Sequence, residues 1–433
     1  MSEVPTDWSL DRLKDVASIN GPSLPADTDP AYEFDYLEIS NVDYYGIIDP
    51  NAIERLRYED APSRARRRVG KNSTVISSVR PNLQAAAFLP DGRNDLVCST
   101  GFNVVQPYES KLLPKFAYYA LISEAGRQYF EATAKGVGYP AVDDKDFNSF
   151  PVPLPPIPQQ ARFVAHLDTR CAAVDAAVSA KRCQLRTLDA ARESLIESAT
   201  IKGIHAGVTP RPVNVDWIPE IPAHWSVCRI KRVVSRVDYG ISQGTEPHGR
   251  YPVLKMGHIR RGEVEYRDLD FIDDVSADLL LEPGDILYNR TNSPDQVGRA
   301  AVFRGNMEAK VTFASYLVRL RTNHRADPYF LNYLVNSSGF LSFARKLAIP
   351  SVQQSNLNST RYCRILIPHP PIEEQHEIAA YLDGKLAALA SVVAGIESQI
   401  ERLTAYRKSL IHECVTGRRR LTEADVNRVK AHG

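Results

Sequence analysis

The chain has 433 residues, of which 43% are hydrophobic and 24% charged, and its formal net charge is +1 at pH 7. This length exceeds what one hydrophobic core needs, so we expect two or more domains, and the hydrophobic content suffices to build them. The near-neutral charge excludes a protein that is basic all over, so any nucleic-acid surface must be a local patch.

The sequence predicts a cytoplasmic protein that does not enter a membrane. No apolar run reaches about 18 residues, and residues 1–5 lack the basic and apolar regions of a signal peptide. No Cys-x-x-Cys pair is present, so neither a zinc site nor a disulfide framework is predicted, and the thiols should be reduced and mostly structural. The six cysteines are Cys98, Cys171, Cys183, Cys228, Cys363 and Cys414.

The first segment, residues 1–151, predicts a domain of mixed strands and helices. Short apolar runs bounded by turn residues predict strands at 36–42, 74–79 and 101–105, and a helical pattern follows at 114–131. Trp8 has apolar neighbours, which favours a core anchor over a base-stacking aromatic.

Residues 152–207 predict a long helix that belongs to an internal repeat. Residues 153–200 align without a gap with residues 368–415, and 18 of the 48 positions are identical. Such self-similarity indicates a duplicated module. Apolar residues recur in both copies at steps of three and four, which is the seam of a coiled coil. The seam residues are Leu167, Val174, Val178, Leu185 and Leu188 in the first copy and Leu382, Leu386, Leu389, Val393, Ile396, Ile400 and Leu403 in the second.

The third segment, residues 208–366, repeats the frame of the first. Pro5-x-x-Trp8-Ser9 is echoed by a Pro-x-x-Trp-Ser run at 222–226, and Pro-x-Phe-x-x-Tyr occurs at both 114–119 and 328–333. Strands are predicted at 253–256, 285–288 and 316–320, and a helical pattern at 328–347, for which Asp327 is suited as N-cap. Trp225 is interpreted, like Trp8, as a core anchor. A second long helix at 367–417 and a tail at 418–433 complete the chain.

Two helices of this length need partners for their apolar stripes. The first must lead from one globular segment to the other and the second must lead back, so they should pack antiparallel. The expected fold class is therefore mixed α/β, with two pseudo-repeated globular domains separated by a long antiparallel two-helix coiled coil. A duplicated module with two-fold symmetry suits duplex DNA. A scaffold that binds only proteins is the alternative.

The order of these features resembles the specificity subunit of type I restriction-modification enzymes over nearly the whole chain. The resemblance rests on the Trp-Ser pairs at 8–9 and 225–226, on the predicted strand at 284–287 with its looser partner at 73–76, and above all on Pro-Pro-Ile at 155–157 and 370–372, which opens each long helix. Each motif alone is weak, but two ordered sets are specific.

This resemblance implies two target-recognition domains, residues 1–151 and 208–366, each reading one half of a bipartite asymmetric DNA site. The spacer helices, 152–207 and 367–417, would set the gap between the half-sites and dock modification (methyltransferase) subunits. Those subunits would carry S-adenosylmethionine for adenine N6 methylation. Restriction subunits would add ATP- and Mg²⁺-dependent translocation and cleavage, so this chain itself needs no cofactor.

Candidates for DNA contact are basic, amide or aromatic residues beside the predicted strands or before the spacer helices. Arginine can contact phosphates or bind guanine O6 and N7 bidentately. The alternatives are a solvated loop for the arginine cluster at 64–68, plain surface charge for the other cations, and simple turns for residues 136–139 and 351–354. The candidates are Arg64, Arg66, Arg67, Arg68, Arg80, Tyr139, Lys255, Arg260, Arg290, Gln353 and Gln354.

Two patterns favour catalysis only weakly. Asp295 with Glu308 and Lys310 fits the loose pattern of Mg²⁺-dependent nucleases, so a stand-alone nuclease is the second alternative, although glycines interrupt the pattern and the first module has no counterpart. Residues 327–330 resemble the Asp-Pro-Pro-Tyr motif of amino methyltransferases but lack its second proline, and helix capping explains them better. No phosphate-binding loop is present. The prediction is a non-catalytic DNA reader without a metal site, acting within a catalytic complex.

Overall fold

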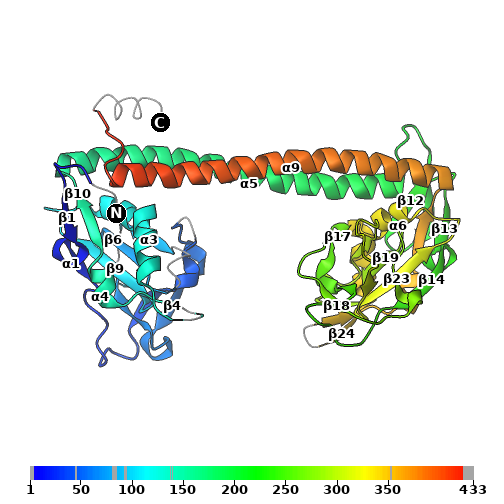
Figure 1. Cartoon of the computed structure of the whole chain (residues 1–433), viewed down its shortest axis with the longest axis horizontal. Coiled ribbons are helices and arrows are strands. Elements are labelled where there is room, and N and C mark those ends of the chain that lie inside the picture. The colour runs from blue at the N-terminus through cyan, green and yellow to red at the C-terminus, as the bar shows by residue number, and fades with distance from the viewer. Residues whose placement is uncertain are drawn as a thin grey trace. The chain divides into compact units, whose positions relative to one another are not determined.

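The computed structural model describes residues 4–43, 46–79, 85–91, 95–136, 138, 140–351 and 354–422. The chain divides into two compact units (Figure 1). The first unit comprises Met1–Arg182 together with Glu397–Gly433, and the second comprises Cys183–Ile396. Each unit therefore contains one globular segment and parts of both long helices.

The first unit contains two four-stranded sheets, of order β2-β9-β6-β7 and β4-β3-β8-β5, and an antiparallel pair of β1 with β10. Its strands are β1 Ser9–Arg12, β2 Ala17–Ile19, β3 Glu33–Leu37, β4 Glu54–Arg57, β5 Ala65–Arg68, β6 Ser73–Ser77, β7 Ala86–Leu89, β8 Leu96–Ser99, β9 Phe102–Pro107 and β10 Pro151–Leu154. Its helices are α1 Leu13–Val16, α2 Pro114–Ile122, α3 Glu124–Thr133 and α4 Asp144–Asn148, and α5 Ile157–Lys202 begins in it.

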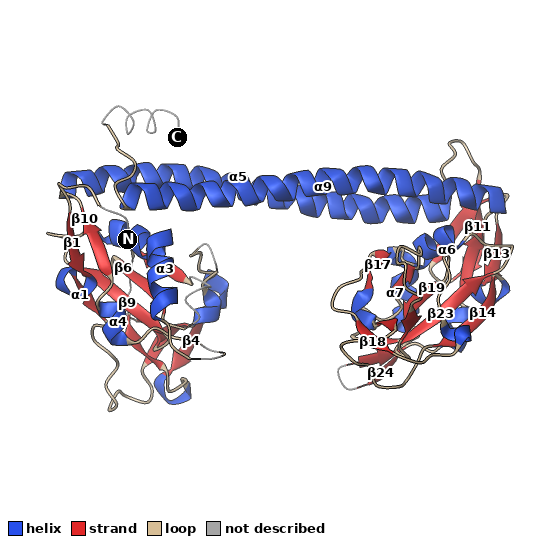
Figure 2. Cartoon of the chain, in the orientation of Figure 1, coloured by secondary structure: helices blue, strands red, loops and turns tan. Residues whose placement is uncertain are grey.

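The second unit is built on a six-stranded sheet of order β14-β23-β19-β21-β17-β16. Its strands are β11 Pro210–Val215, β12 Ile218–Pro222, β13 Ser226–Arg229, β14 Val234–Tyr239, β15 Tyr251–Leu254, β16 Ile259–Arg260, β17 Gly262–Val264, β18 Asp270–Ile272, β19 Ile286–Asn289, β20 Thr291–Asn292, β21 Ala300–Val302, β22 Thr312–Phe313, β23 Leu317–Thr322, β24 Ile349–Ser351, β25 Gln354–Asn356 and β26 Leu366–His369. Its helices are α6 Pro328–Val335, α7 Ser338–Lys346 and α8 Ser359–Arg364, and α9 Ile372–Val415 begins in it. In each unit the strands and short helices lie on one side of the long helices (Figure 2).

Each long helix opens with the Pro-Pro-Ile motif, and three residues later a buried glutamine forms hydrogen bonds with the globular part of its unit. Gln160 accepts from the Leu113 amide at 2.8 Å and donates to the Lys111 carbonyl at 2.9 Å. Gln375 accepts from the Asp327 amide at 3.0 Å and donates to the Arg325 carbonyl at 3.2 Å. Both side chains are fully buried, so these bonds replace water for backbone groups that would otherwise be unsatisfied.

A second repeated contact joins each long helix to the first helix of the pair that opens with Pro-x-Phe-x-x-Tyr, α2 or α6. Tyr119 of α2 donates to Asp168 of α5 at 2.7 Å, and Tyr333 of α6 donates to Asp383 of α9 at 2.5 Å. Burial, reinforced by the carboxylate, raises the pKa of both phenols, so both hydroxyls stay protonated as donors. The repeat thus preserves the residues that attach a long helix to a module.

Both tryptophans of the repeated opening motif are core anchors, as predicted. Trp8 is 7% exposed and packs edge-on against Phe163 of α5, and Trp225 is 2% exposed. A glycine that ends a long helix adjoins each of them. Gly203 (φ +77°) and Gly417 (φ +74°) both adopt the left-handed conformation, and an added Cβ would lie 3.3 Å from Trp225 and 3.2 Å from Trp8, respectively.

The residues of the predicted seam lie buried or half-buried in each unit. In the first, Leu167, Val174 and Val178 are buried, and α5 runs antiparallel to the end of α9, with Asp175 2.9 Å from Arg407. In the second, Leu382 is buried and Leu386 packs against the same core, while His205, just beyond α5, lies 3.0 Å from Glu377 near the start of α9. The remaining seam residues are buried or half-buried.

Three local expectations were wrong in detail. The strand predicted at 36–42 ends at Leu37, because the Asn41 side chain accepts from the Glu38 amide and folds the chain into a 3₁₀ turn. The helical pattern at 114–131 is two helices, because the Ser123 hydroxyl accepts a hydrogen bond from the Gly126 amide and caps the start of α3. The pattern at 328–347 also breaks, at Ser337, whose hydroxyl donates to the Leu334 carbonyl at 2.8 Å and makes no capping bond to α7, and Asp327 caps α6 as expected.

The arginine cluster at 64–68 is also not a solvated loop. Ala65–Arg68 is strand β5, which pairs antiparallel with β8. All six cysteines are free, and only Cys183 is exposed. Over the described residues α9 is the one helix that is long and apolar enough, by length and composition alone, to cross a membrane, with an 18-residue window of mean hydropathy 1.4. Its apolar residues follow the seam, and in each unit seam residues of α9 join the hydrophobic core.

Candidate nucleic-acid interface

The first set of predicted DNA contacts comprises Arg64 and three arginines of strand β5, and these side chains lie in different environments. Arg64 is ion-paired with Glu38 and donates to the Tyr36 hydroxyl at 3.3 Å. The Arg66 guanidinium lies 4.7 Å from the centre of the Tyr58 ring, which is a cation–π contact. These two arginines are held in place but reach the surface.

Arg67 and Arg68 point in opposite directions, as neighbours on a strand do. Arg67 donates to the Phe102 carbonyl and, at 3.2 Å, to Asn103 of β9, and burial lowers its pKa. Arg68 is exposed, and its side chain has no partner in the described part of the chain. Of the four arginines, Arg68 is therefore the one whose hydrogen-bonding groups are all available to a ligand, whereas Arg67 joins two strands.

In the second unit, Lys255 and Arg260 are engaged to different degrees. Lys255 donates to Thr245 at 2.9 Å and forms an ion pair with Asp270, and this hydrogen bond lowers the pKa of the Asp270 carboxyl. Arg260, on β16, has a side chain 65% exposed, with Glu265 3.6 Å away. Such an exposed pair is weak, so Arg260 is free to exchange its partner for a phosphate.

Arg290 belongs to an aromatic surface that the sequence did not predict. Its guanidinium lies 5.2 Å from the Tyr239 ring centre, and its backbone amide donates to the Tyr316 carbonyl at 3.0 Å. Tyr239 and Tyr316 are 44% and 47% exposed, which is unusual for large aromatic residues. An arginine beside exposed tyrosines can contact a phosphate while the rings pack on sugars or bases.

Gln354 belongs to a strand that pairs beside this surface, although Asn356, not Gln354, lies opposite Thr291. It is exposed on β25, and β25 pairs with β20, which directly follows Arg290. No sequence signal separated Tyr239 and Tyr316 from core residues, because aromatic residues in strands are most often buried. Arg80, Tyr139 and Gln353, also predicted contacts, lie outside the described residues.

The nuclease pattern does not assemble into a site. The Asp295 carboxylate accepts from Ser293 at 2.6 Å and from Gln296 at 2.5 Å, and Glu308 and Lys310 are exposed. Within the ranges that the structure describes, no three His, Cys, Asp or Glu side chains group as metal ligands.

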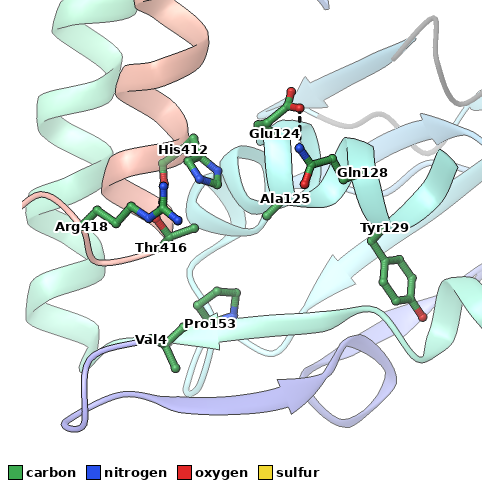
Figure 3. A pocket seen from close by; sticks show the side chains of 9 residues that line it. All are labelled: Val4, Glu124, Ala125, Gln128, Tyr129, Pro153, His412, Thr416 and Arg418. Carbon is green, nitrogen blue, oxygen red and sulfur yellow. Dashed lines mark hydrogen bonds between the residues drawn. The ribbon is translucent and has the colours of Figure 1, made fainter. Parts of the chain in front are cut away.

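The first unit also contains a cavity of about 650 Å³ between α3, β10 and the end of α9 (Figure 3). Ala125 and Tyr129 of α3, Pro153 of β10 and His412 of α9 line it. In the second unit, α7 and β26 correspond to α3 and β10, and Trp217 packs over both. Its indole packs edge-on against Phe340 of α7 and donates to the Leu366 carbonyl of β26 at 2.9 Å. The two modules therefore differ in how this corner is filled.

A family model described as "Type I restriction modification DNA specificity domain" matches residues 5–176 and again residues 227–402. Together the two matches cover more than half of the chain, and each includes one globular segment with part of a long helix.

Two archaeal relatives and one solved structure are similar to the chain. The MjaX protein of Methanocaldococcus jannaschii, named as a type I restriction enzyme specificity subunit, is 27% identical over 205 residues, which are 46% of this chain and 47% of that protein. The MjaVIII specificity subunit of the same organism is 23% identical over 340 residues, 76% of each chain. A structure from work on complex assembly and conformational transition of the type I R-M system aligns with a TM-score of 0.73 at 21% identity, covering 96% of this chain and 99% of that one.

Proposed function

The chain belongs to the family of type I restriction-modification DNA specificity domains, and on this premise we propose that it reads a bipartite, asymmetric DNA site, one half with each unit. The chain spans about half of one relative and three quarters of the other. The specificity role is thus proposed for the whole chain from features of both its modules.

The observation that carries this proposal is the contrast between a repeated frame and unlike surfaces. Gln160 and Gln375 perform the same task in the two units, as do Tyr119 and Tyr333. The exposed candidate contacts differ, with Arg68 on β5 in one unit and Arg290 beside two tyrosines in the other. Two readers that recognise different half-sites on one common frame should differ in this way.

The spacer helices α5 and α9 are proposed to set the gap between the half-sites and to dock modification subunits. Exposed apolar side chains on α9, such as Tyr381 and Val392, support a protein-binding role. Restriction subunits would join the same assembly. S-adenosylmethionine, ATP and Mg²⁺ would act in these partners, and the complex would work in the cytoplasm, where it meets DNA.

Catalysis is assigned to the partner subunits, and the chain is a non-catalytic DNA reader. The stand-alone nuclease is not retained, because family membership accounts for both modules and Asp295, Glu308 and Lys310 occur in only one. Neither is the scaffold that binds only proteins.

Selection of duplexes from a random library tests the proposal, using the chain assembled with its modification subunits. Bound fragments should contain two short fixed segments separated by a constant gap of unspecified bases. Replacing residues 208–366 by the corresponding domain of a relative should change one segment only. A single uninterrupted motif, or a change in both segments, would refute the assignment of one half-site to each unit.

A further inference from the structure

A small cavity in the second unit is lined by arginines from four parts of the chain. It has a volume of about 220 Å³ and lies between α5, the β16–β17 turn and the α6–α7 pair. Arg192, Arg261, Arg299 and Arg345 line it, and Glu193 is the one carboxylate on its wall. The sequence did not single out Arg192, Arg299 or Arg345 as DNA contacts.

Three of the four guanidiniums lack a carboxylate partner. Arg192 donates to the Arg261 carbonyl at 2.8 Å, and Arg299 and Arg345 both donate to the carbonyl of Asp295. No carboxylate lies within 4.0 Å of these three among the described residues, and the buried Nε of Arg345 has no partner at all. Half-buried guanidiniums are commonly paired, so these donors have unused capacity.

The nearby carboxylates are engaged elsewhere. Asp189 pairs with Arg261 at 3.1 Å. Asp383 accepts from Tyr333 and Arg304, and Asp295 accepts from Ser293 and Gln296. Glu197 accepts from Ser338, so its negative charge already lies at the start of α7. The positive end of that helix is therefore compensated and does not contribute to the proposed site. Glu193 is exposed and forms no ion pair in the part of the chain that the structure describes.

The arginines also act on one another. Burial lowers the pKa of Arg192, and the Arg261 guanidinium lowers it further. Burial and the Arg299 guanidinium have the same effect on the pKa of Arg345, and the Asp295 carboxylate partly offsets it. Arginine stays charged despite such shifts, so the repulsion is relieved by an anion and not by loss of a proton.

The first unit lacks this cluster at the equivalent positions, although the helices correspond. Arg407 is the repeat counterpart of Arg192, and it pairs with Asp175 at 2.9 Å, whereas Ala390 of α9 takes the place of that aspartate in the second unit. Eight residues after the N-cap serines, α7 has Arg345 where α3 has Glu131, which pairs with Arg127. At these two positions, the arginine without a carboxylate partner is therefore specific to the second unit.

We propose that Arg192, Arg299 and Arg345 bind one phosphodiester group of the DNA backbone, as a positioning contact that carries no base information. This inference rests on the proposed DNA-reading function. Guanidinium groups match phosphate oxygens in geometry and charge, and contacts to phosphate fix the register of a protein on the duplex. The small, shallow cavity suits a single oxyanion and not a nucleotide base.

The test measures binding of a selected duplex by the assembled complex at increasing KCl concentrations. Replacing all three arginines by glutamine should weaken binding roughly tenfold and reduce the slope of log K against log [KCl] by about one. The preferred sequence should not change. Arg402→Gln, at an exposed position of α9 outside the cavity, is the matched control. Glu193→Gln should act in the opposite direction and tighten binding.

If the triple variant does not fold, Arg299→Gln alone and Glu193→Gln give the same comparison. An unchanged slope and affinity in variants of a complex that still selects a bipartite site would overturn the phosphate contact and leave the proposed function intact. If the wild-type complex selects no DNA, both fail. A second arm adds inorganic phosphate to the chain at constant ionic strength. Thermal stabilisation lost in the arginine variants while DNA binding is unaltered would identify free phosphate as the ligand and overturn the DNA assignment.

Discussion

Replacing Gln375 by leucine should destabilise the second unit selectively. The substitution keeps the volume of the side chain but removes its bonds to the Asp327 amide at 3.0 Å and to the Arg325 and Pro370 carbonyls at 3.2 and 2.9 Å. The site is fully buried, so water cannot replace these bonds. Leaving a buried polar group unsatisfied costs about 1–3 kcal/mol, and with partial relaxation we expect a total of about 3 kcal/mol.

Urea unfolding followed by fluorine NMR of 5-fluorotryptophan resolves the two units. Trp8 reports on the first unit, and Trp217 and Trp225 report on the second. For a urea m-value of about 2 kcal/mol per M, the midpoint of the second unit should fall by about 1.5 M while that of Trp8 changes little. Gln160→Leu is the matched variant and should shift Trp8 instead. Equal shifts of all three signals in both variants would refute the idea that each glutamine stabilises its own unit.

Three further predictions concern function. The isolated chain should neither cleave nor methylate DNA, and Mg²⁺-dependent cleavage that Asp295→Asn abolishes would contradict this. Arg68→Ala should weaken DNA binding without loss of thermal stability, whereas Arg67→Ala should lower thermal stability. Changing Arg64, Arg66, Arg67 and Arg68 together to alanine should flatten the salt dependence of binding or relax the preference at one base position by about 1–3 kcal/mol. If neither DNA affinity nor sequence preference changes, the cluster is plain surface charge. Inserting one heptad after Val178 and another after Val393 keeps the seam and adds about 10 Å of helix, so the selected half-sites should move apart by about three base pairs. Tight binding with the original gap would show that the helices do not set it.

The sequence predicted the elements that depend on periodicity and repetition. The seam from Leu167 to Leu403 follows from steps of three and four residues, and the role of Trp8 and Trp225 follows from their apolar neighbours. The helix breaks at Ser123 and Ser337 were missed, because a serine within an apolar pattern gives no sign that one helix ends and another begins there.

The candidate site was harder to predict because it depends on which charges are paired across the chain. Arg67 and Arg68 are adjacent and chemically identical, yet Arg67 bonds to β9 and the Arg68 side chain has no partner among the described residues, a difference set by the alternation of β5. Likewise, Arg192 and Arg407 occupy equivalent repeat positions, but Arg407 pairs with Asp175 whereas Arg192 donates to the Arg261 carbonyl. Long-range pairing of this kind leaves no local signal.

The division of the chain into units has a consequence for synthesis on the ribosome. The core around Trp8 and Phe163 includes Leu410, Ile411, Cys414 and Val415, so the first unit lacks part of its interior until the end of α9 is made. Its two parts are separated by the continuous second unit, Cys183–Ile396. At roughly 5–20 residues per second, that interval lasts roughly 10–40 s. The later segment can complete its core first, while the nascent N-terminal part keeps an open apolar face and depends on chaperones or on rapid closure by the last helix to be translated.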